Sequence, residues 1–444
     1  MKIINYKRKP DIVFREEEEI GLLFDPDTGK INILNETGKF IWSRLDGKNM
    51  ARGIIEEMSR DFEIVDEKTA RKDYDTFVDS LGKMGFLENY SSITDLPLSV
   101  CLGITSKCNL NCRHCINRAS GSSQSRPEPV MTYEKIVDVI DAMGEGGTKA
   151  INIFGGEPLC HPDFRRIIER INKYPISISL NTNGTLIDVE MARWLKAHKI
   201  TSTVVSFDGS TPEIMERMRG AGTFERCIKG IRALRNEGLS VLLSVTLTKL
   251  NYKDVRDMVV AGKKLDAAAI RFNHVFFGGN AACFVEELYL SPDEEREAIE
   301  AVWQASQEFE GFIYPDSSYL CQKKKLDKVK DHKPSNDKII VGPCGAAGSK
   351  CAVRPDGWVT PCEIMWDVKC GNLKEKSLAD IWQNSETMNS FRKPMEVDLD
   401  EIPECKGCVY QYLCFLGHRC YPYYNPGGIK NRDIYCWKKK NISR

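Results

Sequence analysis

The chain has 444 residues, which is enough for two or three domains and at least one large core. Its 63 basic and 63 acidic side chains balance, so the composition does not indicate a nucleic-acid or anionic-membrane partner. No stretch approaches the roughly eighteen uninterrupted apolar residues of a membrane helix, and the first residues lack the apolar core of a signal peptide. We therefore expect a cytoplasmic protein without a membrane partner.

Residues 1–90 predict a small α+β domain. Two short apolar runs, IGLLFDP at residues 20–26 and KINIL at 30–34, flank the turn sequence DTG and predict a β-hairpin. Three stretches with helical spacing of apolar residues follow. Strands followed by helices within so short a region favour an α+β arrangement.

Residues 91–310 alternate between strand and helix patterns six times. The predicted strands are residues 98–105, 150–154, 176–181, 202–207, 239–247 and 268–272. This alternation predicts an α/β fold with a parallel sheet, either open or curved into a partial (β/α)6 barrel. A further helix is predicted to begin after Ser291, because Pro292 suits the first helical position and Glu294 completes a capping box.

The rest of the chain is predicted to form a linker and a cysteine-rich domain. Residues 311–341 are predicted to form a linker, because residues 321–338 are basic and polar, as is typical of a solvated loop or helix face. Residues 342–444 are rich in cysteine, glycine, proline and aromatic residues and show little regular patterning. We expect this last segment to bury little surface and to need metal for stability. In a reducing compartment, the 17 cysteines of the chain are better explained as metal ligands than as disulfides.

The sequence SKCNLNCRHC, residues 106–115, contains three cysteines directly after the first strand of the middle region. The carboxyl ends of parallel strands are where such folds build active sites. Three thiolates leave one coordination position open, which is typical of a catalytic metal centre, and on an iron–sulfur cube one iron stays free for a ligand. The alternative is a zinc site that borrows His114 or His161.

The spacing of Cys108, Cys112 and Cys115 resembles the radical S-adenosylmethionine (SAM) superfamily, and further motifs extend the resemblance over residues 98–310. These motifs are GGEP at residues 155–158, NTNG at 181–184, and SFDG at 206–209 with RMRG following. Each lies at a predicted strand end, as one shared pocket requires. A departure is His114, where the family often has an aromatic residue.

The resemblance implies a SAM-binding site. The residues assigned to it are Gly155, Gly156, Glu157, Asn183, Ser206 and Arg219. Glycine allows the backbone to approach a ligand, Glu157 supplies a carboxylate for the methionyl amine, and Arg219 can grip the methionyl carboxylate with two donors. By analogy with the family, a cluster electron cleaves SAM, and the resulting 5′-deoxyadenosyl radical abstracts a substrate hydrogen. The electron would come from a donor such as flavodoxin or ferredoxin.

The cysteine pattern of the last region resembles the SPASM domain, which holds two auxiliary clusters. The resemblance assigns Cys344, Cys351, Cys362 and Cys420 to the first cluster and Cys405, Cys408, Cys414 and Cys436 to the second, so that the chain would carry three [4Fe-4S] clusters. Two departures are a five-residue gap before Cys420 and the extra thiol of Cys370, which could replace Cys351. Glu363 follows Cys362, and in related enzymes such an acid can take a proton from the substrate radical. Zinc ribbons are the alternative for this region.

Residues 10–89 resemble the PqqD-like recognition element of ribosomal peptide biosynthesis, with LNETG, Trp42 and LDGK at the matching places. A winged-helix-like packing domain is the alternative. The resemblance implies a radical SAM/SPASM peptide maturase that binds the leader of a ribosomally made precursor and forms a thioether or carbon–carbon cross-link. We expect the leader to add a strand at Lys30–Leu34, beside Phe40 and Ile41. Two alternatives are a radical enzyme acting on a folded protein or a small molecule such as a porphyrin, and a non-catalytic zinc-binding scaffold.

Overall fold

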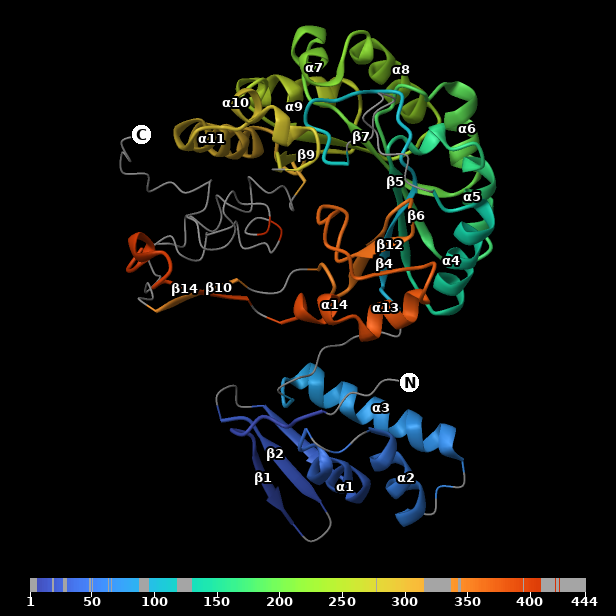
Figure 1. Ribbon diagram of the computed structural model, residues 1–444, viewed down its shortest axis with the longest axis vertical. Helices are drawn as coiled ribbons and strands as arrows, with labels where there is room; N and C mark the ends of the chain where they lie inside the picture. Colours follow the sequence, from blue (N-terminus) through green and yellow to red (C-terminus); the bar gives the residue numbers. More distant parts are fainter. Residues whose placement is uncertain are drawn as a thin grey trace. The chain divides into compact units, whose positions relative to one another are not determined.

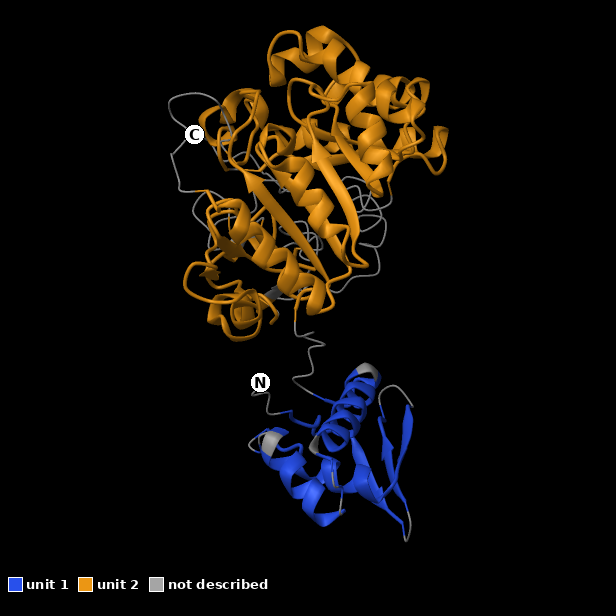
Figure 2. Cartoon of the chain, turned by 90° about the vertical axis from the view of Figure 1, so that its right-hand side faces the viewer, with its two compact units in different colours: residues 1–93 blue, residues 94–444 orange. Residues whose placement is uncertain are grey.

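The computed structural model describes most of the chain in two compact units, residues 1–93 and 94–444 (Figure 2). The residues outside the description are 1–5, 18–19, 27–29, 48, 50, 63, 65, 88–95, 118–129, 277, 315–336, 342–344, 394, 409–419, 421–422 and 424–444. Cys321, Cys344, Cys414 and Cys436 are therefore outside it, as is most of the predicted linker. Among the described helices, none is both long and apolar enough to cross a membrane.

The amino-terminal unit is a three-stranded antiparallel sheet packed against three helices. Its elements are β1 (Val13–Glu16), β2 (Gly21–Phe24), β3 (Ile31–Leu34), α1 (Glu36–Arg44), α2 (Ala51–Asp61) and α3 (Glu67–Met84), and the strand order is β1-β2-β3. The predicted hairpin and the three helices are confirmed. Side chains of Asn35 and Asp66 cap α1 and α3, and Gly85 ends α3 in the left-handed region at φ 84°.

The second unit is built on a curved nine-stranded sheet with helices on its outer side (Figure 1). Its parallel strands are β4 (Ser99–Thr105), β5 (Ala150–Gly155), β6 (Ser177–Thr182), β7 (Ile200–Ser206), β8 (Val241–Leu247) and β9 (Ala269–His274). The helices that follow these strands are α4 (Tyr133–Glu145), α5 (Phe164–Ile171), α6 (Val189–Ala197), α7 (Pro212–Arg219), α8 (Thr223–Asn236), α9 (Val255–Lys264), α10 (Val285–Leu288) and α11 (Pro292–Glu308). All six predicted strands are present in the predicted order, and the sheet forms a partial barrel.

The carboxyl-terminal region extends the same sheet, which the sequence did not predict. The strands β11 (Lys350–Val353), β12 (Trp358–Thr360) and β13 (Gly371–Asn372) continue the sheet beyond β4, and β11 pairs with β4 in parallel. The other elements are α13 (Leu378–Asn384), α14 (Glu386–Ser390) and the antiparallel pair β10 (Lys338–Val341) and β14 (Met395–Asp398). The expectation of a segment with little core is therefore wrong: Val353, Val359 and Trp382 are fully buried.

The predicted capping box at the start of α11 is confirmed, with Ser291 accepting from the Glu294 amide and Glu294 accepting from the Ser291 amide. One turn into this helix, buried Glu295 lies 2.6 Å from Nε2 of His274 at the end of β9. This pair joins the last parallel strand to the helix that covers it.

We predict that Glu295→Ala destabilises the second unit by about 3–5 kcal/mol, because the substitution removes the carboxylate that lies 2.6 Å from the buried His274 side chain. Urea unfolding followed by circular dichroism measures the effect. Glu297→Ala, at an exposed position of the same helix, is the control. Equal unfolding midpoints for the two variants would show that the pair contributes nothing.

Candidate radical SAM site

The three-cysteine loop lies at the carboxyl end of β4 and is folded back on itself. The Cys115 amide donates to the Cys112 carbonyl at 3.3 Å. Burial raises the pKa of Cys108 to about 11 and that of Cys112 to about 12, and the charge of Cys115 acts on both. The sulfur atoms therefore lie within electrostatic range of one another. No three His, Cys, Asp or Glu side chains of the described residues are arranged to hold a single metal ion.

The glycines of the GGEP motif bring β5 against the start of the cysteine loop. The Gly156 amide donates to the Thr105 carbonyl at 2.7 Å, and the Glu157 amide donates to the Lys107 carbonyl at 2.8 Å. A Cβ on Gly156 would lie 2.2 Å from the Lys107 carbonyl oxygen, and Gly155 adopts φ 152°. The close packing of the chain's own backbone therefore requires glycine at both positions, whether or not a ligand also approaches them.

Glu157 connects the ends of β5 and β6. Its carboxylate accepts from the Asn183 amide and the Thr182 hydroxyl, both at 2.8 Å, and from the Leu159 amide at 3.3 Å. The side chain is buried, and burial raises its pKa to about 7, although the hydrogen bonds from these donors lower it. Asn183 in turn donates through Nδ2 to Oδ1 of Asn109 at 2.9 Å, and this Nδ2 lies 4.0 Å from the Cys108 sulfur.

Arg219 is buried at the end of α7 and is engaged by three side chains of its own chain. Its Nε donates to Asp208 at 2.6 Å, one terminal nitrogen lies 3.8 Å from the Cys112 sulfur, and the other lies 3.3 Å from Nε2 of His114. Burial opposes ionisation of Asp208, but the Arg219 guanidinium and His114 hold its pKa well below the ordinary value. Asp208 also accepts from the Thr246 amide at 2.8 Å. This network connects the cysteine loop to the ends of β7 and β8.

A further contact to the cysteine loop comes from the segment after β9, which the sequence interpretation missed. The Asn280 amide donates to the Cys115 carbonyl at 2.8 Å, and its side chain donates to the Cys112 carbonyl at 3.0 Å. Gly279 has φ 58°, and a Cβ there would lie 2.2 Å from the Cys115 carbonyl oxygen. The signal was present in the sequence: GGN follows the last strand just as GGE follows the second.

Ser206 is the last residue of β7 and lies on the inner face of the sheet, in register with Ser244 of β8. The structure therefore brings Gly155, Gly156, Glu157, Asn183 and Arg219 against the cysteine loop through the contacts above, and places Ser206 on the same edge of the sheet.

The described auxiliary cysteines fall into three groups. Cys362 belongs to a buried cluster that includes Ala346 and Met365, and Cys420 packs against it. Burial raises the pKa of Cys351, and Cys370 lies close enough for its charge to add to this effect; both thiols interact with Arg392. The choice between Cys351 and Cys370 therefore stays open.

Cys405 and Cys408 lie on one turn, where the Cys408 amide donates to the Cys405 carbonyl at 3.2 Å. Outside these groups, Cys101 and Cys227 are buried, whereas Cys283 is exposed.

Glu363, the residue after Cys362, forms two polar contacts. It accepts from the Lys350 ammonium at 3.1 Å and from the Cys101 thiol at 3.3 Å. Although burial opposes ionisation, Lys350 holds the pKa of Glu363 below its ordinary value, while burial keeps Cys101 a thiol. Since the Glu363 side chain is 30% exposed, it remains accessible to a small group.

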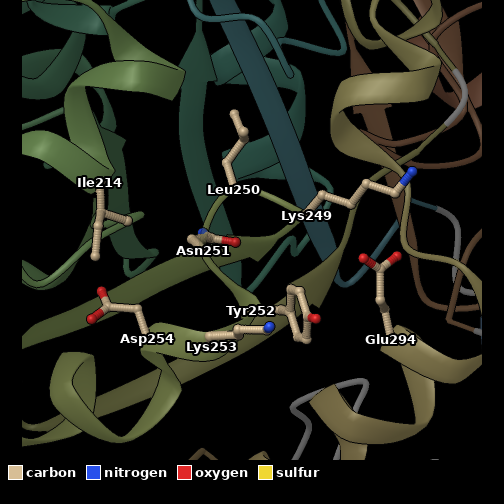
Figure 3. A pocket seen from close by; sticks show the side chains of 8 residues that line it. All are labelled: Ile214, Lys249, Leu250, Asn251, Tyr252, Lys253, Asp254 and Glu294. Carbon is tan, nitrogen blue, oxygen red and sulfur yellow. The ribbon is translucent and has the colours of Figure 1, made fainter.

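A pocket of about 370 Å³ lies apart from these residues, beside the segment after β8 (Figure 3). Its lining consists of Ile214, Lys249, Leu250, Asn251, Tyr252, Lys253, Asp254 and Glu294. None of the cysteines or ligand-binding residues predicted from the sequence lines it.

Comparison with protein families assigns the three regions. Residues 102–260 match the radical SAM superfamily, residues 344–409 match the SPASM iron–sulfur cluster-binding domain, and residues 21–87 match coenzyme PQQ synthesis protein D. This chain is a radical SAM enzyme. The radical SAM enzyme thus carries a SPASM domain and an amino-terminal PqqD-like domain, as its sequence motifs predicted, and SAM and iron–sulfur clusters are the cofactors that these domains imply.

Its relatives include enzymes with different substrates. The chain is 28% identical over 355 residues to an AdoMet-dependent heme synthase of Methanosarcina barkeri, covering 78% of this chain and 97% of that protein. It is 25% identical over 332 residues to the mycofactocin maturase MftC of Mycobacterium tuberculosis, covering 74% and 80%. Streptococcus suis SuiB bound to the precursor peptide SuiA shares the fold with a TM-score of 0.57 at 16% identity, covering 87% of this chain and 90% of that chain. The radical SAM enzyme is therefore related both to peptide maturases and to heme synthases.

We predict that Gly279→Ala lowers the iron content of this radical SAM enzyme by displacing the cysteine loop, because the added methyl group would overlap the Cys115 carbonyl oxygen. Iron and sulfide are measured after anaerobic reconstitution. Gly311→Ala is a matched control, since Gly311 also has a positive φ, 75°, but a Cβ there would meet nothing within 4 Å. Equal losses in both variants would attribute the effect to backbone strain alone.

Proposed function

We propose that this enzyme modifies a ribosomally synthesised precursor peptide, forming a thioether or a carbon–carbon cross-link, and that its amino-terminal unit binds the leader. The observation that carries the proposal is the exposed edge of β3 in a unit that matches PqqD. Relatives that mature peptides support it.

The backbone of β3 is arranged to accept another strand. In the antiparallel β2–β3 pair, the Asp25 amide donates to the Lys30 carbonyl at 2.9 Å. Hydrogen-bonded and non-hydrogen-bonded positions alternate along such a pair. Ile31 and Ile33 therefore occupy non-hydrogen-bonded positions, and their amide and carbonyl groups point away from β2. An extended peptide could pair with these groups as a fourth strand.

The side chains at this edge are also exposed. Ile31 is 57% exposed and Ile33 is 62% exposed, on the sheet face that also carries Leu22 and Phe24. An added strand would cover part of this apolar surface. Ile41, which the sequence interpretation placed in the binding wall, is instead buried in the core of the unit. Phe40 is partly buried against that core and stacks edge-on with Phe62 at 5.4 Å between ring centroids.

We predict that Ile33→Pro weakens leader binding at least tenfold, because proline removes an outward-facing amide. The test is a fluorescence titration of a labelled precursor peptide. Glu16→Pro is the control: the Glu17 amide donates to the Ile20 carbonyl at 2.9 Å, so the Glu16 amide also points outward, but from β1 at the opposite edge. The same affinity for wild type and both variants would remove the main support for a peptide substrate.

The catalytic part of the proposal rests on the cysteine loop. We propose that Cys108, Cys112 and Cys115 hold the SAM-binding [4Fe-4S] cluster. Hydrogen-bond donors near two of the sulfurs, Asn183 and Arg219, suit thiolate ligands. When bound, the cluster and SAM supply a 5′-deoxyadenosyl radical that abstracts a substrate hydrogen.

The chain's own residues position this chemistry. We propose that Gly155, Gly156, Asn183 and Ser206 line the SAM site, and that Glu157 and Arg219 act there chiefly by holding the surrounding loops together. The proposed auxiliary ligands are Cys344, Cys351 or Cys370, Cys362 and Cys420 for one cluster and Cys405, Cys408, Cys414 and Cys436 for the other. Glu363 is the proposed proton acceptor beside the first of these. An external protein such as flavodoxin or ferredoxin would supply the electron.

We predict that replacing Cys108, Cys112 and Cys115 together by alanine abolishes 5′-deoxyadenosine formation under a strong reductant. The variant should retain the iron of the auxiliary clusters, because their ligands lie elsewhere in the chain. Product is measured by chromatography and iron by colorimetric assay. Undiminished 5′-deoxyadenosine would disprove the assignment of this loop.

A second candidate function is the modification of a porphyrin. The match to the heme synthase covers 97% of that protein, which favours this candidate, but leaves about a fifth of the present chain unmatched. A porphyrin would not need a leader-binding strand, so the titration of Ile33→Pro also separates the two functions.

A further inference from the structure

The inner face of the curved sheet carries polar atoms that lack hydrogen-bond partners. Among the buried atoms of the described residues, these include Oδ1 of Asn152 on β5, Oδ1 of Asn181 on β6 and Nε of Arg271 on β9. Asn152 pairs in register with Cys101 and Ser179. Both Asn152 and Asn181 alternate along their strands with fully buried side chains, so they point to the face opposite the helices. Buried polar groups normally have partners, so these atoms indicate that something else occupies the inner face.

Arg271 is the charged member of this group. Its neighbours Ile270, Phe272 and His274 are buried, and His274 contacts Glu295 of α11, so these side chains face the helices. Successive side chains of a strand point to opposite faces. Arg271 therefore points to the inner face, where it lies in register with Ser244, and Ser244 with Ser206.

The Arg271 guanidinium stacks on an aromatic ring. Its centre lies 4.4 Å from the ring centroid of Tyr314, which follows the segment that pairs with β9. Stacking on an aromatic ring orients a guanidinium and leaves its N–H edge for a ligand. Within the described part of the chain, no carboxylate forms an ion pair with Arg271. Other arginines of this unit do have such partners, as Arg219 does in Asp208 and Arg354 does in Asp356.

The polar groups without hydrogen-bond partners define the chemistry of a ligand that would satisfy them. A guanidinium with a buried, unsatisfied N–H is best satisfied by a carboxylate, which can accept two parallel hydrogen bonds. The Asn152 and Asn181 oxygens, farther along the same face, need hydrogen-bond donors, and backbone N–H groups can supply them. A carboxylate together with N–H groups is what a peptide offers, whereas a phosphate would supply acceptors only.

We propose that Arg271 binds a carboxylate of the substrate inside the barrel, either an acidic side chain or the terminal carboxylate of the peptide. The identity of the ligand as a peptide rests on the proposed function, whereas the carboxylate site itself does not. Ser206, proposed above for the SAM site, is two strands from Arg271, or roughly 10 Å along the sheet at about 4.8 Å per strand. A methionyl carboxylate held at Ser206 thus leaves Arg271 for a second carboxylate.

The test uses the full-length, cluster-reconstituted enzyme with SAM bound. Equilibrium dialysis measures the binding of three radiolabelled probes: N-acetyl-Ala-Glu-Ala-amide, N-acetyl-Ala-Gln-Ala-amide and N-acetyl-Ala-Ala-Ala with a free carboxylate. Wild type should bind at least one carboxylate probe at least tenfold more tightly than the glutamine probe. Arg271→Gln should abolish this preference, and Arg271→Lys, which keeps the charge but not the two-donor geometry, should retain part of it.

The matched control is Arg226→Gln, on the exposed surface of α8, where the Arg226 side chain donates to the Gly222 carbonyl at 2.9 Å. It should bind all probes as wild type does, and circular dichroism checks that each variant is folded. Two results would overturn the proposal. One is equal binding of the carboxylate and glutamine probes by wild type. The other is a loss of SAM affinity in Arg271→Gln with unchanged probe preference, which would assign the site to the methionyl carboxylate.

A fourth probe separates this proposal from the proposed function. If coproporphyrin binds, loses affinity in Arg271→Gln, and the tripeptides do not bind, the carboxylate site stands while the peptide substrate is wrong. If the tripeptides bind through Arg271 but leader titration shows no role for β3, the carboxylate site again stands and leader recognition must lie elsewhere.

Discussion

The close approach of backbone segments around the cysteine loop is the constraint on which the rest of the site depends. Residues 106–115 have almost no regular structure of their own, and their carbonyl groups are held by amides from the ends of β5 and β9. Such contacts require glycine at Gly156 and Gly279, because any side chain would overlap a carbonyl oxygen. The loop is therefore positioned by the ends of other strands, and the parallel sheet brings those ends to one edge.

Buried charge is the second element of this arrangement. Arg219 and Asp208 neutralise each other beneath the cysteine loop, and Glu157 is surrounded by hydrogen-bond donors. Each charged group is held by segments from different strands, so that a displacement of any one would leave a charge without its partner. Glu157 and Arg219, which the sequence motifs assign to ligand binding, thus also stabilise the loops that form the site. Arg271 differs from them, since its guanidinium has a stacking partner but no counter-charge among the described residues.

Much of this fold could be predicted from the sequence because it depends on local patterns. The six strands and the helices between them are visible in the alternation of apolar runs, and the capping box at Ser291 is a local signal. The cysteine spacing and the GGEP motif likewise lie in single short segments. The placement of β11 beside β4 could not be predicted in this way, because strand pairing depends on partners far apart in the chain. For the same reason, the Arg219–His114 contact and the Asn280 contacts became apparent only in three dimensions, and leader binding at β3 stays a prediction.

The pairing of β11 with β4 also has a consequence for how the protein is made. Until Lys350–Val353 are synthesised, β4 has no neighbour on one side, and an unpaired edge strand is prone to associate with other chains. More than 200 residues separate the end of β4 from the start of β11. At about 5–20 residues per second, the edge stays open for on the order of tens of seconds during translation. The strand that carries the cysteine loop is therefore among the first parts of the barrel to be made and among the last to be enclosed.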